Sequence, residues 1–244
     1  MNLPESVRRV ADALAQRGHA HAPRMLDASA RTAQEAADAL GVQLGQIAKS
    51  IVFRREPDQV AVMVVTSGDQ RVDERKLAAR VCPGGHKLAR ADAEFVKQRT
   101  GFAIGGVAPL AHVQPPVLLL DLSLFRFEQV WAAAGHPHAV FPASPAQLAL
   151  LTQARLDDVS TQGMDLQARA MALLRAQAAM VACDPQAEPP SPCLSVCCMA
   201  PDNGLCVGCL RTIDEIAQWS SLSVPQRHRV WQAIAQRAAP QTGD

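Results

Sequence analysis

The sequence predicts an α/β fold for the first part of the chain and a small metal-stapled helical module for the last part. Two observations indicate this division. Apolar strand patterns alternate with amphipathic helix patterns over roughly the first 150 residues, which is typical of α/β proteins. Four cysteines near the C-terminus follow the spacing C-x3-C-x8-C-x2-C. We expect a domain at 1–155, a helix and linker at 156–189, and a cysteine module at 190–238.

In the first unit, helical and extended patterns alternate. Residues 4–17 have Val7, Val10 and Leu14 on one helical face, and Gly18 ends the pattern. The β-branched runs at 47–54 and 59–66 flank a turn and predict a hairpin. Further helices are expected at 33–40, 73–81, 91–99 and 144–151, and further strands at 117–122, 130–134 and 139–141.

The second unit is expected to be helical. An Ala- and Met-rich helix is predicted at 166–181, and the proline-rich segment 184–192 has the composition of a linker. After the cysteines, two capping boxes predict short helices: Thr212-x-x-Glu215 and Ser223-x-x-Gln226. We expect this two-helix tail to pack against the cysteine knuckles and little else.

Charge and hydropathy narrow the function classes. The formal net charge is +1, so bulk electrostatics do not indicate a nucleic-acid-binding protein. Residues 49–99 contain 11 basic and 7 acidic side chains, a local excess of 4 that could meet a phosphate backbone, although an ordinary solvated surface is favoured from charge alone. The first residues do not resemble a signal peptide and no apolar run approaches 18 residues, so we expect a soluble cytoplasmic protein without a membrane partner.

The cysteine spacing predicts a metal site. Five of the seven cysteines lie between Cys193 and Cys209, and in a cytoplasmic chain this favours metal ligation over disulfides. Two close thiol pairs flanking a short loop suit zinc or an iron–sulfur cluster, and spacing does not decide between them. The expected ligands are Cys193, Cys197, Cys206 and Cys209. Cys198 is a fifth thiol that could compete with its neighbour or remain unligated.

Two features of the first unit could carry chemistry. Lys49 lies in an otherwise apolar strand, where a lysine more often faces solvent than lines a site. The glycine-rich segment 100–109 could bring backbone N–H groups close to a carbonyl or phosphate oxygen, although glycines are common in ordinary loops. It is neither a Walker motif nor a dinucleotide fingerprint. No G-x-S-x-G elbow occurs, so a serine hydrolase has no support.

Taken in order, six segments resemble the YbaK family of aminoacyl-tRNA synthetase-associated editing domains. They are IAKSIVF at 47–53, TSGDQRVD at 66–73, LARADAE at 88–94, the glycine-rich segment 100–109, LD at 120–121 and AGH at 134–136. The resemblance spans about residues 25–152. It implies a mixed, partly closed sheet surrounded by helices. It also implies a trans-acting deacylase that removes wrong amino acids from tRNA, typically a small residue from tRNA(Pro).

The resemblance also implies roles for individual residues. Lys49 matches the functional lysine of the family, and His136 lies where members differ in substrate preference. The expected catalytic residues are Lys49, Gly105 and Gly106, and the expected substrate-binding residues are Gly101, Val107, Pro109, Asp121, Gly135 and His136. Glycine N–H groups can stabilise a developing oxyanion while Lys49 acts as a fixed cation. No nucleophile or cofactor is required if a ribose hydroxyl or the substrate's own side chain assists.

Residues 190–238 resemble a small bacterial domain of unknown function that is often described as a predicted iron–sulfur protein, and this implies no activity. The main hypothesis is therefore a hydrolase that acts on the acceptor end of mischarged tRNA, with prolyl-tRNA synthetase as a further candidate partner. The alternative is a non-catalytic protein that binds aminoacyl-tRNA or a nucleotide, with a cysteine module that docks a partner. A weaker third hypothesis is a redox or metal sensor.

Overall fold

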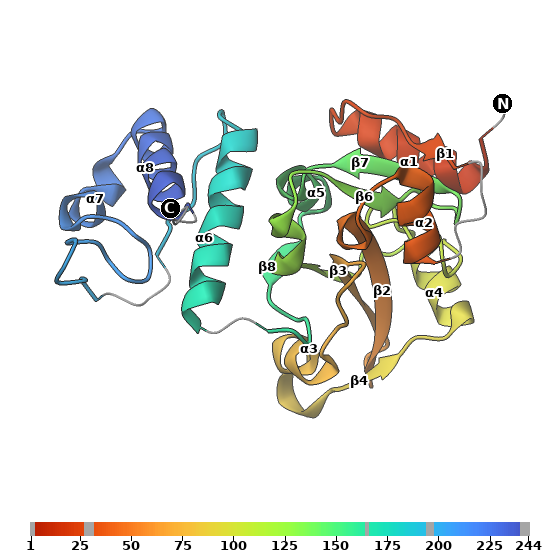
Figure 1. Cartoon of the computed structure of the whole chain (residues 1–244). Coiled ribbons are helices and arrows are strands. Elements are labelled where there is room, and N and C mark those ends of the chain that lie inside the picture. The colour runs from red at the N-terminus through yellow and green to blue at the C-terminus, as the bar shows by residue number, and fades with distance from the viewer. Residues whose placement is uncertain (1–2, 27–31, 164–165, 194–197, 240–244) are drawn as a thin grey trace. The chain divides into compact units, whose positions relative to one another are not determined.

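The computed structural model describes residues 3–26, 32–163, 166–193 and 198–239, and the chain divides into two compact units after Gly163. The first unit contains the sheet and the second is helical (Figure 1). No helix in the described residues is long and apolar enough to cross a membrane. Each unit has its own hydrophobic core and is described separately.

The first unit is built on one mixed sheet. Within the described residues it has eight strands in the order β1-β7-β6-β2-β3-β5-β8, with β4 attached to β2. The strands are β1 (Arg24–Met25), β2 (Ile47–Glu56), β3 (Val60–Ser67), β4 (Lys87–Arg90), β5 (Val117–Asp121), β6 (Val130–Ala133), β7 (Ala139–Ala143) and β8 (Arg155–Asp157). The predicted mixed α/β architecture is confirmed.

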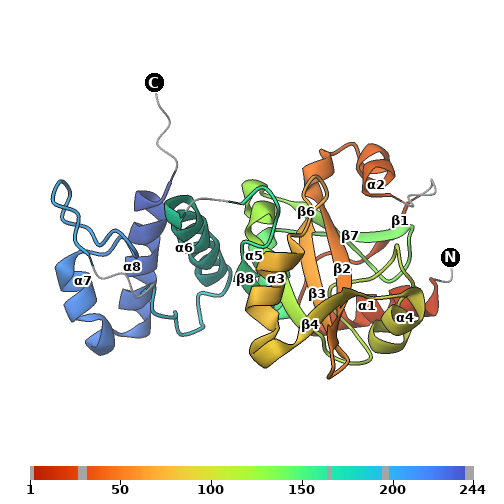
Figure 2. The same cartoon turned by 90° about the horizontal axis from the view of Figure 1, so that it is seen from below.

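Helices surround this sheet. They are α1 (Glu5–Gln16), α2 (Ala33–Leu40), α3 (Glu74–Val81), α4 (Ala93–Thr100) and α5 (Pro145–Thr152), with 3-10 turns at Leu44–Gln46, Pro83–Gly85 and Leu122–Arg126. Figures 1 and 2 show α3 and α4 on opposite sides of the β2–β3 hairpin. The apolar face of α3 contributes Leu77 and Val81 to a core shared with Phe53, Val62 and Leu119 of the sheet.

Strand β2 has an interrupted edge. One edge pairs antiparallel with β3 along almost its whole length. On the other edge, Ile47 and Ala48 pair with β6, whereas β4 pairs only from Phe53 onward. In the described part of the chain, residues 49–52 therefore have no strand partner on that edge. Their backbone groups are left to other partners, and this gap locates the site described below.

The longer predicted elements of the first unit are found within a few residues of their expected limits. The helix caps explain several boundaries: the Thr32 hydroxyl accepts from the Glu35 N–H at 3.2 Å, and the Asp92 carboxylate accepts from the Phe95 N–H at 2.8 Å. The sequence does not predict β1, β4 and β8. These strands have two to four residues, too few for a period-2 pattern to stand out.

The second unit is organised around two helices. It contains α6 (Leu166–Cys183), α7 (Ile213–Ala217), α8 (Val224–Arg237) and a 3-10 turn at Trp219–Ser221. Leu174 and Ala178 of α6 share a buried core with Val230, Trp231 and Ile234 of α8. The expectation that the tail packs against the cysteine knuckles and little else is therefore wrong, because α8 buries its apolar face against α6.

The proline-rich segment is docked along α8 within this unit. The Trp231 indole N–H donates to the Pro190 carbonyl at 2.9 Å, His228 Nε2 lies 3.0 Å from the Ala187 carbonyl, and Arg227 forms an ion pair with Glu188. The proline-rich composition predicts a segment without regular structure, and this is what the structure shows. Such a segment can still pack against a helix, since proline has no backbone N–H that needs a partner. The expected domain limits of 155, 189 and 190 stay predictions.

Candidate active site

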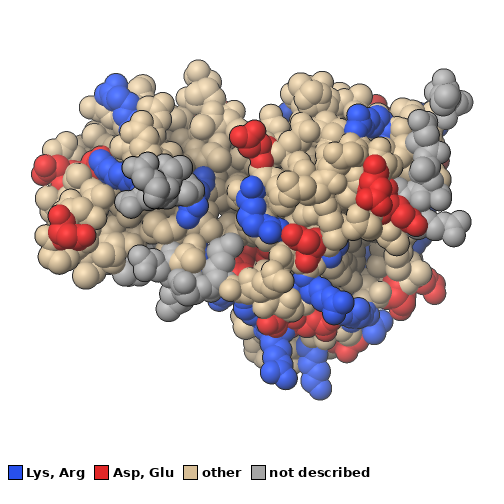
Figure 3. Space-filling model, in the orientation of Figure 1, with Lys and Arg blue, Asp and Glu red and all other residues tan. Residues whose placement is uncertain are grey.

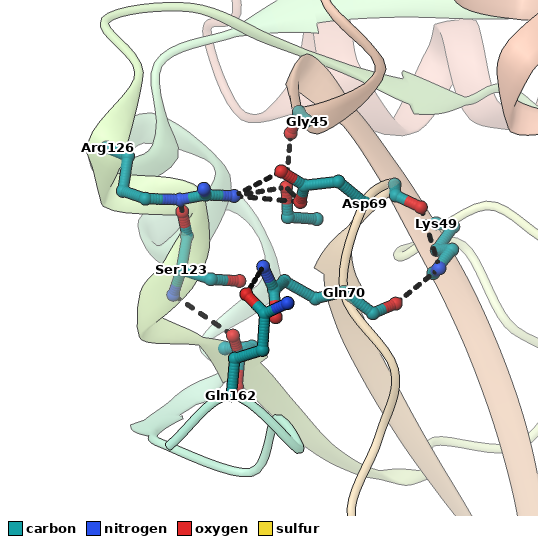
Figure 4. A network of polar contacts seen from close by, with 10 residues as sticks. Gly45, Lys49, Asp69, Gln70, Ser123, Arg126 and Gln162 are labelled. Carbon is teal, nitrogen blue, oxygen red and sulfur yellow. Dashed lines mark hydrogen bonds and ion pairs between the residues drawn. The ribbon is translucent and has the colours of Figure 1, made fainter. Parts of the chain in front are cut away.

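Lys49 lies in the part of β2 that lacks a described strand partner on one edge, and its ammonium group is held by backbone carbonyls. Nζ donates to the Gly68 carbonyl at 2.9 Å and to the Gln70 carbonyl at 2.5 Å, both from the turn that follows β3 (Figure 4). Burial lowers the pKa of Lys49 below 10.5, while Asp69 raises it and Arg71 lowers it. The lysine is thus a half-buried cation with a fixed direction, unlike the solvent-facing lysine that the strand pattern alone favours.

Two cavities meet at Lys49. The larger, of about 660 Å³, extends along the unpaired edge of β2 toward Arg71, Glu74 and Arg90. The smaller, of about 190 Å³, is mostly apolar and is lined by residues of α2, β6, β7 and the start of β2. Four residues line both cavities: Lys49, Ser50, Gly105 and Val107. A ligand spanning the two would pass between the β2 edge and the glycine-rich loop.

The two glycines predicted to be catalytic have different environments. Gly105 is exposed, has φ of +90° and borders both cavities. Gly106 is buried, and its N–H donates to the Ala103 carbonyl at 3.1 Å. A Cβ at Gly106 would lie 2.7 Å from the His136 Cα, so this glycine allows the two loops to approach closely. Gly105 is therefore the better candidate for a backbone donor to a substrate.

The remaining predicted substrate-binding residues do not border the cavities, apart from Val107. Gly101 ends α4 with φ of +77°, and a Cβ there would lie 2.7 Å from the Arg9 guanidinium. Gly135 has φ of +88°, and its Cβ would lie 2.6 Å from the Ser6 carbonyl. Pro109 is buried. Their positions explain backbone geometry around the site, and their roles in substrate binding stay predictions.

Asp121 is buried at the end of β5, away from both cavities. Its carboxylate accepts from the backbone N–H groups of Ser123 at 3.0 Å and Val159 at 2.9 Å. Burial raises the pKa of Asp121, and these hydrogen bonds oppose that rise. The Asp121 carboxylate therefore connects the segments that follow β5 and β8. Its placement does not support a role in substrate binding.

His136 lies in the turn next to the smaller cavity but does not line it. Its Nδ1 accepts from the His138 N–H at 3.2 Å, and the next residue, Pro137, lines the cavity. A substitution at His136 would therefore act on the cavity through the 135–138 turn. The predicted influence on substrate preference stays a prediction.

Sequence reasoning missed several cavity residues. Ser50 borders both cavities, and its hydroxyl is buried with no hydrogen-bond partner among the described residues. Arg71 and Arg90 add positive charge to the larger cavity. Ser50 directly follows Lys49, so the lysine itself was the available signal. The two arginines belong to the region 49–99, whose basic excess does not by itself indicate a site.

The surface around this site carries mixed charge. Figure 3 shows basic side chains over α3 and β4, interspersed with acidic ones. Arg90, for example, forms an exposed ion pair with Glu74. The excess of basic residues in 49–99 therefore does not form a continuous positive face in this view, and the arginines at the cavity act locally.

Half of the predicted metal site can be described. Cys206 and Cys209 are each 2% exposed and lie on one tight turn, in which the Leu210 N–H donates to the Cys206 carbonyl at 2.8 Å. Burial by itself raises the pKa of Cys206, but hydrogen bonds from the backbone of Cys209 and Gly208 lower it overall. Arg211 Nε donates to Cys209 Sγ at 3.3 Å. Donors directed at both sulfurs are what a pair of ligating thiolates requires.

The other half is less complete. Cys193 and the fifth thiol, Cys198, are exposed, and Cys197 lies outside the described residues. In the described ranges, no group of three or more His, Cys, Asp or Glu side chains converges as a metal site. The four-cysteine site cannot be completed without segment 194–197, so it stays a prediction.

The fold and this site define an α/β protein with a two-part cleft at Lys49. Residues 27–151 match the family model of the aminoacyl-tRNA editing domain, and the chain belongs to this family. Residues 191–238 match the model of a protein of unknown function, DUF1289. Both resemblances inferred from the sequence are thereby confirmed.

Two kinds of relative support the family assignment. The uncharacterized protein YwhH of Bacillus subtilis (strain 168) is 36% identical over 122 residues, covering 50% of this chain and 75% of that protein. A solved structure described as "a putative trans-editing enzyme for prolyl tRNA synthetase" is 43% identical, with a TM-score of 0.60 over 65% of this chain and 99% of that chain. Another, from work on computational epitope grafting onto scaffold proteins, is 42% identical with the same TM-score and coverage.

Proposed function

We propose that this protein is a trans-acting deacylase that hydrolyses the ester bond of mischarged tRNA. The observation that carries the proposal is the meeting of a small apolar cavity and a larger basic one at Lys49, opposite Gly105. An aminoacyl ester has the same two-part form: a side chain on one side of the carbonyl and a charged nucleotide on the other.

Each cavity suits one part of this substrate. Alanine, valine and proline side chains line much of the smaller cavity, which would hold a small amino acid and exclude a large one. Lys49, Arg71 and Arg90 line the larger cavity and would attract the phosphate of the terminal nucleotide. The reacting carbonyl would then lie near the residues common to both.

The proposed chemistry uses positioning and charge. The Gly105 N–H and the Lys49 ammonium would stabilise negative charge that develops on the carbonyl oxygen. The Ser50 hydroxyl is buried and has no partner among the described residues, so a rotation toward the cavity would let it orient the substrate or the attacking water. A water molecule attacks the carbonyl carbon, with a ribose hydroxyl assisting by relaying a proton; the ester C–O bond breaks, and the tRNA hydroxyl and the free amino acid are released. No cofactor is required for this step.

We further propose tRNA(Pro) carrying a small amino acid as the substrate, with prolyl-tRNA synthetase as a candidate partner. Support comes from the related structure whose description names that synthetase and from the small volume of the apolar cavity. The side chain of alanine, cysteine or serine would occupy this cavity, and the proposed reaction needs no membrane partner.

A deacylation panel tests both levels of the proposal. Release of alanine, cysteine, serine and proline from tRNA(Pro) is measured beside release of the same small residues from a second tRNA. We expect hydrolysis of a small mischarged residue and slower hydrolysis of the proline ester. If the folded protein binds these tRNAs but hydrolyses none, the non-catalytic binding alternative replaces the deacylase. Equal rates on both tRNAs would remove the tRNA(Pro) assignment alone.

We also propose that Cys193, Cys197, Cys206 and Cys209 bind zinc or an iron–sulfur cluster with a structural role. Support comes from the buried Cys206–Cys209 turn and the donors directed at its sulfurs. Elemental analysis and visible absorption of the anaerobically purified protein distinguish the two metals. Cys206→Ser should lose the metal and Cys198→Ser should retain it. A protein without stoichiometric metal would contradict the proposal.

A further inference from the structure

We propose that Asp69 and Arg126 are positioning residues that hold and tune Lys49. The proposal rests on the deacylase function proposed above. Lys49 takes its direction from the carbonyls of Gly68 and Gln70, which belong to a turn outside any helix or strand. Asp69 lies between these two residues, so whatever fixes its side chain also fixes both carbonyls (Figure 4).

The Asp69 carboxylate is gripped by the guanidinium of Arg126. One terminal nitrogen of Arg126 lies 2.8 Å from Oδ1 and 3.0 Å from Oδ2 of Asp69, and 3.0 Å from the Ser67 hydroxyl. The Ser67 hydroxyl also lies 2.7 Å from Asp69 Oδ1. Arg126 is itself held by its Nε, which donates to the Ser123 carbonyl at 2.8 Å. The 3-10 turn after β5 thereby anchors the turn after β3.

Other contacts close this turn on both sides. Ser67 Oγ lies 2.5 Å from the Gly45 carbonyl, and a Cβ at Gly68 would lie 2.2 Å from the Leu44 carbonyl. On the far side, the Gln70 amide donates to the Gln162 side chain at 3.0 Å. The Asp69–Arg126 pair is the charged contact in this network, and it is the one that can influence both the geometry and the proton affinity of the lysine.

Charge gives the pair a second effect. The charged groups around the Lys49 ammonium are Asp69 and Arg71 on the turn, and Glu74 and Arg90 across the larger cavity. Burial lowers the pKa of Lys49, and the carboxylate of Asp69 offsets part of this by raising it. Burial would raise the pKa of Asp69, but its hydrogen bonds from Arg126 and Ser67 lower it overall. Arg126 therefore favours the ionised form of Asp69, and Asp69 favours the protonated form of Lys49.

Two substitutions of Asp69 separate its effect on the position of Lys49 from its effect on the charge around Lys49. Asp69→Asn retains an oxygen acceptor for Arg126 but removes the negative charge, so Lys49 should deprotonate at lower pH. Asp69→Ala removes the anchor as well, and we expect deacylation to fall by about ten- to a hundredfold, the range for a displaced catalytic group. Arg126→Lys keeps the charge without the fork-shaped donor and should lose less activity than Arg126→Gln.

A matched control is available at the opposite end of the same hairpin. Asp58 is held by Arg55 through several hydrogen bonds, and its side chain is 31% exposed, compared with 34% for Asp69. Asp58 borders neither cavity at Lys49. Asp58→Asn removes the same charge from the same kind of pair and should leave both Lys49 and deacylation unchanged.

The test is an NMR titration of lysine-labelled full-length protein. The chain contains four lysines, Lys49, Lys76, Lys87 and Lys97, so the signals can be assigned by single substitutions. The pKa of Lys49 should fall in Asp69→Asn and stay unchanged in Asp58→Asn. In parallel, the alkaline limb of the deacylation profile should move to lower pH in Asp69→Asn.

A coupling experiment completes the test. If Asp69 acts through Lys49, adding Asp69→Ala to Lys49→Ala should cause no further loss of activity. A full additional loss in that background, or an unmoved Lys49 pKa in Asp69→Asn, would overturn the inference. Absence of hydrolysis by the wild-type protein would contradict the proposed function instead, because the titration reads the coupling without any substrate.

Discussion

Lys49 combines two properties that oppose each other, a positive charge and partial burial. The carbonyls of Gly68 and Gln70 compensate by accepting from its ammonium, and nearby Asp69 supplies negative charge. Such a cation is held in place before a substrate binds, so little reorganisation is needed when charge develops in a transition state. Substitution of Lys49 is therefore the most direct test of the proposed chemistry.

Removing the Lys49 cation should abolish most of the activity. We expect Lys49→Ala to lower the deacylation rate about a hundredfold or more, comparable with the loss of an oxyanion donor, without lowering the melting temperature. Because burial lowers the pKa of Lys49, wild-type activity should decline in the alkaline range as the cation is lost. Lys49→Arg should keep reduced activity without that decline, since arginine stays charged. Full activity in Lys49→Ala would contradict the role.

His136 should tune substrate preference instead of the chemical step. Its backbone packs on Gly106, and the next residue, Pro137, lines the smaller cavity. Reshaping a small pocket changes discrimination by about 1–3 kcal/mol, so His136→Ala should shift the ratio of rates for alanine and serine esters. An equal fall for every ester would indicate a catalytic role instead.

At the scale of elements, the site depends on a gap in the pairing of β2. Because β6 and β4 pair with its two ends only, the middle of the strand presents its edge to the cavities. The sequence predicts β2, its hairpin and the position of Lys49, since these follow from local apolar patterns and from the family resemblance. It does not predict β4, whose pairing ends the gap, because four residues carry too weak a pattern.

The polar network around Lys49 was also beyond local patterns. Asp69 and Arg126 are 57 residues apart, and neither residue type is unusual in its own segment. The sequence does not predict a role for Ser50, because a serine in a strand carries no periodic signal. In the structure its hydroxyl is buried with no hydrogen-bond partner among the described residues. Conversely, Gly101 and Gly135 belong to motifs of the family resemblance, and their backbone conformations account for a glycine there without a ligand.

The contact between the turn after β3 and the Leu44–Gln46 turn should be sensitive to one added methyl group. A Cβ at Gly68 would lie 2.2 Å from the backbone carbonyl of Leu44, which cannot move without shifting that turn. We expect Gly68→Ala to cost about 1–3 kcal/mol of stability and to lower deacylation, because the Gly68 carbonyl holds Lys49. Gly41→Ala is the control. Its φ of +67° makes an alanine strained there, but the added Cβ would have no described atom within 4 Å apart from those of its chain neighbours. Denaturant unfolding and deacylation of both variants check this, and normal activity in Gly68→Ala would contradict it.

At the scale of the whole molecule, the described residues around the proposed site all belong to the first unit. Those that line the two cavities lie between Thr32 and Thr161, and the division between the units follows Gly163. A protein ending at Gly163 should therefore fold and hydrolyse the same esters within about threefold of the full chain. Circular dichroism and the deacylation panel check this. A folded but inactive fragment would mean that the second unit completes the site.

The second unit should respond to metal removal in two parts. Trp219 lies 5.2 Å from Arg211 in a cation–π contact, and Arg211 donates to Cys209, so this tryptophan reports on the cysteine turn. Trp231 is 1% exposed in the core shared by α6 and α8, and Trp219 packs only at the edge of that core. In a Trp131→Phe background, chelation or Cys206→Ser should shift Trp219 emission to the red. Trp231 should stay buried and become exposed only in a separate, less cooperative unfolding transition.

This outcome follows from how the apolar surface is divided. The described cysteine turn buries Cys206, Cys209 and Arg211 and packs Leu210 at the edge of the α6–α8 core. We expect its order to depend mainly on ligand bonds, which commonly supply about 10 kcal/mol or more in small structural sites. The α6–α8 pair has its own buried side chains and should survive as a loosely packed pair of helices. Trp219→Phe and Trp231→Phe variants assign the two signals. A reduced, metal-free protein whose Trp219 emission and unfolding midpoint match those of the purified form would rule out metal-dependent folding of this unit.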